Sequence, residues 1–278
     1  MKFHHHSLSF LVLTAVLLGN LLWGAQAQAP ATDKKGTGDV DLSKFPGEVM
    51  EDVVIPVPSE IFSVLEKLGD PDWKREISVR VTPKFSDRID IALLLGTVVA
   101  DGFLAVQAQD SKTVETIGRK VLELSKALGL QDAVLPHCNT ILDSAKAKQW
   151  ETVRREFDAT QRTVRLTMES MKDKDLAECV SVGGWLAGTQ VITSVITKHY
   201  TADKAELLNQ PHLVEYFRAS IKKAIAHLPN SDKLKLVSTG LKHIQDVMGD
   251  GSATLDKESV EAIHRITSEL VATIISKH

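Results

Sequence analysis

The sequence is short of cysteine and of aromatic residues: two of its 278 residues are cysteine, and 5% are aromatic. Two cysteines cannot form the disulfide framework that small secreted domains use in place of a large core. The low aromatic content fits an aliphatic helical core better than a β-sandwich. A chain of this length can bury such a core without disulfides or metals.

Charge of one sign is not in excess, because 33 basic residues face 36 acidic ones. This balance gives no electrostatic reason to expect a nucleic acid or a polybasic contact with membranes. Catalytic motifs are missing as well, including the Gly-x-Ser-x-Gly elbow and the phosphate-binding loop. Glu261 and His264 have the spacing of di-iron ligands, but such a site needs a second copy. We predict a non-enzymatic protein with no cofactor, no metal and no nucleic-acid partner.

The N-terminus resembles a secretory signal peptide. Met1 and Lys2 precede an uncharged apolar stretch, 8–23, which ends in Ala25-Gln26-Ala27. This is the small-x-small pattern that signal peptidase cleaves. We predict cleavage after Ala27, a disordered leader over 28–48, a single all-helical domain over 49–278, and a periplasmic or secreted location. The expected mature chain carries no transmembrane segment.

Cys138 and Cys179 are the only pair that could form a disulfide. A bridge closing a loop of this length would stabilise the fold by about 4 kcal/mol. Three successive antiparallel helices would, however, place the two cysteines roughly 13 Å apart along the bundle axis. A disulfide needs Cα atoms closer than about 7 Å. We expect two free, buried thiols, with a disulfide as the alternative.

Breaking residues divide the first part of the domain. The prolines of 55–58 impose extended backbone, and Ser59 is placed to cap a short helix that runs to Leu68. Gly69-Asp70-Pro71 ends that helix. Alternating apolar residues over 76–82 are compatible with a brief edge strand.

From Ser86 onward the sequence predicts helices only, about eight in number. Ser86 and Ser111 are the expected N-caps, Gly129 and Gly249 the expected C-terminal stops, and Pro211 an interruption. We therefore predict an all-α, multi-helix bundle.

Two segments, 89–109 and 176–197, are apolar around most of their circumference and should form two central buried helices. Each contains two small residues four positions apart, Gly96 and Ala100 in the first and Gly184 and Gly188 in the second. Mid-helix glycine costs up to about 1 kcal/mol relative to alanine, so close approach of the two backbones is expected to offset it. A transmembrane hairpin is the competing interpretation, but both segments contain many polar residues.

Asp101 interrupts the first apolar segment, and a carboxylate in that position must be paired or neutral. In one interpretation it makes a structural hydrogen bond, for example to the Trp185 indole or to Gln190. In the other it forms the polar floor of a ligand pocket lined by Gly96, Gly184 and Trp185. These four residues, Gly96, Asp101, Gly184 and Trp185, are the predicted ligand site.

Three stretches, 55–60, 95–101 and 184–188, together resemble a group of exported, all-helical bacterial proteins of unknown function. The shared features are a proline-containing lead-in, a Gly-x-x-x-Ala-Asp helix and a later Gly-Trp helix. The resemblance implies export and a helical fold, and it implies no activity.

The sequence thus predicts an exported helical protein of the cell envelope with a non-enzymatic binding or accessory role. Its partner would be an unknown small molecule or an envelope protein. A structural interaction module that uses an amphipathic helix face, such as 150–171, is the first alternative. An enzyme of unknown class is the second.

Overall fold

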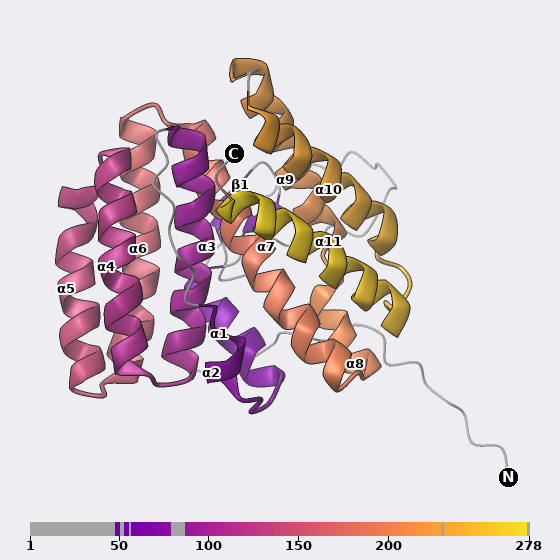
Figure 1. Cartoon of the computed structure of the whole chain (residues 1–278), viewed down its shortest axis with the longest axis horizontal. Coiled ribbons are helices and arrows are strands. Elements are labelled where there is room, and N and C mark those ends of the chain that lie inside the picture. Colours follow the sequence, from indigo (N-terminus) through magenta and orange to yellow (C-terminus); the bar gives the residue numbers. More distant parts are fainter. Residues whose placement is uncertain (1–47, 51–52, 56, 79–86, 229–230, 277–278) are drawn as a thin grey trace, which may run out of the picture. The chain divides into compact units, whose positions relative to one another are not determined.

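The computed structural model describes residues 48–50, 53–55, 57–78, 87–228 and 231–276. These belong to one structural unit, Asp41–His278 (Figure 1). The predicted signal peptide and almost all of the predicted leader lie outside the described residues. Eight helices of sixteen or more residues follow Asp87 in the described part of the chain: α3 (Arg88–Gln107), α4 (Ser111–Leu128), α5 (Gln131–Lys146), α6 (Trp150–Ser170), α7 (Lys174–Lys198), α9 (Pro211–His227), α10 (Asp232–Met248) and α11 (Lys257–Ile275).

Shorter elements complete the fold: β1 (Glu48–Met50), β2 (Val53–Ile55), α1 (Pro58–Lys67), α2 (Trp73–Glu76), α8 (Ala202–Ala205) and the 3₁₀ turn η2 (Glu206–Leu208). The two strands pair antiparallel, with Val49 opposite Val54. The all-α prediction is confirmed. The strand considered over 76–82 begins inside α2, Ile77 and Ser78 are in neither helix nor strand, and 79–82 lie outside the described residues.

Connections of two or three residues join α3, α4, α5, α6 and α7 in turn. Helices joined so closely must run antiparallel to their neighbours, so α3 and α7 point in the same direction. Each of α3 to α6 packs on the next, and α7 packs on α3, α6, α9 and α11 (Figure 1). α10 lies against α9 and α11. α3 and α7 therefore join the α4–α6 helices to the C-terminal helices.

The first turns of three helices differ from the prediction by one or two residues. Val57, not Ser59, is the N-cap of α1, because Pro58 is suited to the first helical position. The Val57 N–H donates to Glu60 Oε2 at 3.0 Å. Asp87 caps α3 by accepting from the Ile89 N–H at 2.8 Å, and Asp110 caps α4. An aspartate next to each predicted serine accepts the same bonds.

The turns that end α3, α4, α5 and α6 share one geometry. In each, the first or second residue after the helix has a positive φ, and the next N–H bonds to a carbonyl five residues earlier, as in Leu130 to Ser125 at 2.8 Å. Gly129 fills the positive-φ position after α4, as predicted. The other three turns place Gln109, Lys148 and Lys172 there, at φ of 50°, 59° and 61°.

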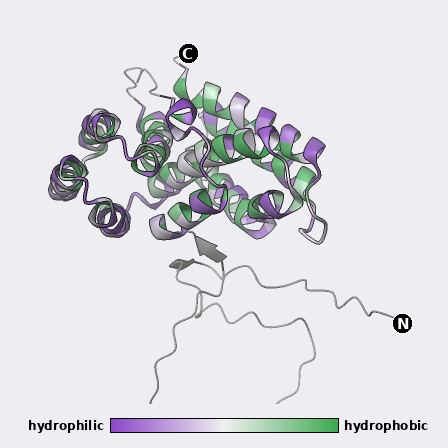
Figure 2. Cartoon of the chain, turned by 90° about the horizontal axis from the view of Figure 1, so that it is seen from below, coloured by the Kyte–Doolittle hydropathy of each residue, from purple (hydrophilic) through white to green (hydrophobic). Residues whose placement is uncertain are grey.

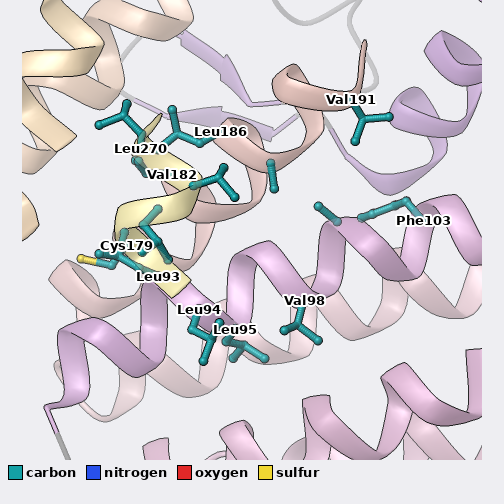
Figure 3. Packing of buried hydrophobic residues seen from close by; sticks show 14 of the residues in the cluster. Leu93, Leu94, Leu95, Val98, Phe103, Cys179, Val182, Leu186, Val191 and Leu270 are labelled. Atoms are coloured by element: carbon teal, nitrogen blue, oxygen red, sulfur yellow. The ribbon is translucent and has the colours of Figure 1, made fainter. Parts of the chain in front are cut away.

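The central helices are buried as predicted. Leu93 of α3, Val182 and Leu186 of α7 and Leu270 of α11 belong to the same buried hydrophobic cluster (Figure 3). Elsewhere, hydrophilic residues lie mostly on the outer faces of the helices (Figure 2). By length and composition α3 and α7 could each cross a membrane, but 89% and 56% of their apolar windows are buried inside the protein. Packing in the core accounts for this apolar character.

The glycines of the two central helices bring the backbones together. A β-carbon on Gly96 would lie 2.0 Å from the Val180 carbonyl oxygen and 2.6 Å from the Gly184 backbone nitrogen, so the predicted approach of Gly96 and Gly184 is found. One on Gly183 would lie 2.2 Å from the Leu93 carbonyl oxygen, whereas Gly188 has open space around it. The crossing therefore uses Gly96, Gly183 and Gly184, and the predicted contact at Gly188 is wrong.

Candidate functional site

The four predicted site residues take different positions. Gly96 and Gly184 lie at the α3–α7 crossing, where a β-carbon on Gly184 would come 3.4 Å from the Gly96 carbonyl oxygen. Backbone atoms fill that space, so no ligand can enter between these two residues. Asp101 is buried on the same helix as Gly96.

Trp185 lies on the side of α7 that faces α9. Its ring is 5.7 Å from the ring of Phe217, and its indole N–H donates to Gln210 Oε1 at 3.5 Å. Gln190 donates to Ser268 at 3.3 Å. The Trp185 indole therefore bonds to Gln210, and not to Asp101 as one interpretation of the sequence predicts.

A hollow of about 420 Å³ lies where α3 and α7 begin and α9 ends. Its lining combines apolar side chains with charges of both signs: Asp87, Arg88, Ile89, Lys172, Asp173, Asp175, Leu176, His227 and Leu228. Arg88 Nη2 pairs with Asp173 Oδ2 at 2.6 Å, and His227 Nδ1 lies 2.8 Å from Asp175 Oδ2. Lys172, which has a positive φ, also lines the hollow. Six of these nine side chains are ionisable and three are apolar, so the hollow suits a polar ligand.

A second hollow, of about 350 Å³, separates the segment 70–74 from the end of α3 at 107–109. Gln109, another positive-φ residue, lines it. Lys74 Nζ lies 3.8 Å from Asp110 Oδ2 beside it. None of the four predicted site residues lines either hollow.

Buried charge occurs at the junction of α3, α10 and α11. Lys233 Nζ pairs with Asp90 Oδ2 at 3.1 Å and donates to the Ser276 carbonyl at 3.0 Å. The ammonium thereby satisfies a carbonyl at the end of α11. The arrangement joins α3 to α10 and to the end of α11, and neither Asp90 nor Lys233 lines either of the two hollows.

The thiols of Cys138 and Cys179 are free and buried, as predicted. Burial raises the pKa of Cys138 to about 11 and the pKa of Cys179 to about 12. Such thiols are poor nucleophiles, since the thiolate is the reactive form.

The di-iron spacing at Glu261 and His264 does not form a metal site. His264 Nδ1 lies 3.0 Å from Thr193 Oγ1, and Glu261 pairs with Lys257 at 3.7 Å. Among the described residues, no group of three or more His, Cys, Asp or Glu side chains could hold a metal ion.

Two sets of residues were missed by the sequence prediction. One is the charged lining of the larger hollow, which comes from three helix ends far apart in the chain. The other is a hydrogen-bonded array of His137 with Glu156 and Thr163. Its only local signal is the seven-residue separation of Glu156 and Thr163, which places both on one side of α6. Nothing in the sequence indicates that His137 of α5 faces them.

Comparisons with protein-family models, with curated proteins and with solved structures give no match to this chain. The resemblance to exported helical bacterial proteins therefore stays a prediction.

Proposed function

We propose that this chain is an exported helical protein of the cell envelope with a non-enzymatic binding or accessory role. The apolar stretch 8–23 and the Ala25-Gln26-Ala27 site support export. Burial of α3 and α7 supports a mature chain without a membrane span. N-terminal sequencing of the cell-envelope fraction should read from Gln28, or from Pro30 if the second Ala-x-Ala site is cleaved. A mature chain that retains 8–23 would contradict export.

The larger hollow carries the binding role. Its lining contains three basic side chains, Arg88, Lys172 and His227, and three aspartates. Its volume falls within the range of small-molecule sites, about 300 to 1,000 Å³. The favoured ligand is a small polar molecule that carries both an acidic and a basic group.

Native mass spectrometry of the protein purified from its own envelope tests this role. A small molecule should co-purify with the wild type and be lost from His227→Ala. His243→Ala is the matched control, because His243 is an exposed histidine on α10, outside the hollow. If both variants retained the small molecule equally, the hollow would be excluded as the binding site.

An interaction module is the second candidate. Of the four large apolar side chains exposed among the described residues, three lie on α5, on α6 and directly after α6: Leu135, Leu166 and Met171. The favoured occupant is the apolar face of a helix from an envelope protein. A photocrosslinker at position 166 should then join a partner in intact cells, and one at Leu236 of α10, the fourth exposed residue, should not. Equal crosslinking at both positions would contradict a specific docking face.

A further inference from the structure

His137 of α5 bridges two residues of α6. Its Nδ1 lies 2.6 Å from Glu156 Oε1, and its Nε2 lies 2.8 Å from Thr163 Oγ1. All three side chains are partly exposed. A carboxylate, an imidazole and a hydroxyl in this order form the arrangement that activates a hydroxyl nucleophile in unrelated folds.

The direction of the hydrogen bonds follows from the carboxylate. An ionised carboxylate can only accept, so Nδ1 carries the proton that Glu156 receives. In the neutral ring, Nε2 then has a free lone pair and accepts the hydrogen of Thr163. The hydroxyl is oriented and polarised toward a base.

Thr163 differs in this from the other threonines of the helices. Eight of them donate to the carbonyl four residues earlier: Thr116, Thr140, Thr160, Thr167, Thr193, Thr239, Thr267 and Thr273. That bond is the usual partner of a helical threonine. The Thr163 hydroxyl is directed to the imidazole instead. Thr193 Oγ1 also lies 3.0 Å from a histidine nitrogen, His264 Nδ1, but its hydrogen goes to the Thr189 carbonyl.

We propose that Thr163 is a nucleophile for activated esters, with His137 as its general base and Glu156 as a positioning residue. Backbone N–H groups around Thr163 are engaged within α6, so solvent must stabilise the tetrahedral oxyanion. This restricts the substrate to esters with good leaving groups, such as aryl esters. Leu166, one turn further along α6 and 52% exposed, favours a short apolar acyl group. This hydrolysis would be an enzymatic activity in addition to the non-enzymatic binding role proposed above, and it does not depend on that role.

The reaction has two balanced steps. Thr163 Oγ1 attacks the ester carbonyl while its proton moves to His137 Nε2, and the bond to the aryl oxygen breaks. The phenolate leaves with the proton from the imidazolium, which leaves an acyl-threonine. Water then attacks the acyl carbon with its proton taken by Nε2, and the carboxylic acid leaves as Thr163 regains its hydrogen.

Acylation of the full mature chain by p-nitrophenyl butyrate tests the proposal. We expect a burst of nitrophenolate, absent from Thr163→Val, and a rate about 100-fold lower in His137→Ala, the usual scale of general-base catalysis. Added imidazole should restore part of the His137→Ala rate. Glu156→Gln should lower the acylation rate without changing KM. Thr167→Val is the matched control, because its hydroxyl bonds to the Thr163 carbonyl and should leave the burst intact.

Peptide mapping of the trapped wild-type protein gives a readout that does not depend on folding of the variants. The butyryl group should be found on Thr163, and circular dichroism should show that each variant keeps its helices. Acyl groups on lysine or histidine with none on Thr163 would overturn the proposal, as would an undiminished burst in folded Thr163→Val.

Discussion

Gly96 of α3 faces Val180 of α7 so closely that a β-carbon on Gly96 would lie 2.0 Å from the Val180 carbonyl oxygen. Side chains cannot separate the helices at this point, so backbone packs directly on backbone. Gly183 has the reciprocal relationship with Leu93. These contacts fix the position of the two central helices, on which the remaining helices are arranged.

Alanine at Gly96 or Gly183 should therefore destabilise the protein by about 3 kcal/mol, since the new methyl group meets backbone that cannot give way. Gly188→Ala is the matched control in α7, because nothing lies within 4 Å of its β-position. It should stabilise by about 0.5 to 1 kcal/mol through helix propensity alone. Urea denaturation measures all three. A Gly96→Ala protein as stable as the wild type would contradict the crossing.

Three non-glycine residues in the described part of the chain have a positive φ. At one of them, Lys148, glycine substitutions at two adjacent positions should change the stability in opposite directions. Lys148 is exposed at φ 59°, where an L-residue costs about 1 to 2 kcal/mol. Lys148→Gly should stabilise the protein by about 1 kcal/mol, after the larger backbone entropy of glycine is subtracted. Ala147→Gly, at the preceding right-handed position, should destabilise it by a similar amount. If both substitutions changed the free energy of unfolding in the same direction in chemical denaturation, the turn geometry would be refuted.

Local chemistry explains which features of the fold were predictable. Glycine and proline restrict or free their own backbone dihedrals, so their effect on a helix is local. A helix ends at Gly129 and Gly249 and begins at Pro211, where predicted. The αL residue Lys172 has no such signal, because its conformation is imposed by the helices on either side. The N-caps of α3 and α4 were misplaced by one residue because serine and aspartate make the same bond, and that of α1 by two residues because Pro58 takes the first helical position.

Long-range contacts explain what the sequence could not predict. Gly96 and Gly184 were identified at the crossing, but the other close contact of α7 is made by Gly183 rather than by Gly188, and that choice depends on the rotation of α7 about its axis. His137 meets Glu156 and Thr163 only through the packing of α5 on α6. The charges of the larger hollow come from three separate helix ends. Periodicity identifies the buried face of one helix but not the side chains opposite it.

The pair of Asp90 and Lys233 should respond unequally to substitution. The Lys233 side chain is 5% exposed and that of Asp90 is 21% exposed. Asp90→Ala removes a counter-charge from a buried ammonium and should destabilise by about 3 to 5 kcal/mol. Lys233→Met leaves a carboxylate that reaches water and should cost less, about 1 to 3 kcal/mol. A lower urea midpoint for Lys233→Met than for Asp90→Ala would contradict this prediction.

Asp101 is buried in α3, and its substitution separates a structural role from a ligand-binding one. In the structural role, Asp101→Ala removes one member of a buried polar contact and should destabilise by about 1 to 3 kcal/mol. Asp101→Asn should cost less. Thermal melts of the three proteins measure this. An unchanged midpoint for Asp101→Ala would instead support a ligand pocket at this residue.

The two buried thiols predict a loss of stability at high pH. Burial raises the pKa of Cys138 to about 11 and the pKa of Cys179 to about 12 in the folded protein. Thiols in the unfolded chain ionise near pH 8.5, so above that pH the unfolded chain binds fewer protons than the folded protein. The free energy of unfolding must then fall as the pH rises from about 9 toward 11.

Urea denaturation at pH 8 and pH 10, under reducing conditions, measures this loss. The Cys138→Ala, Cys179→Ala double variant is the control, because lysine and tyrosine titrations affect it and the wild type alike. The wild type should lose more stability than the double variant between the two pH values. Thiol titration at pH 8 should find neither cysteine reactive in the folded protein and both reactive after unfolding. A fast-reacting thiol in the folded state would contradict the burial from which both expectations follow.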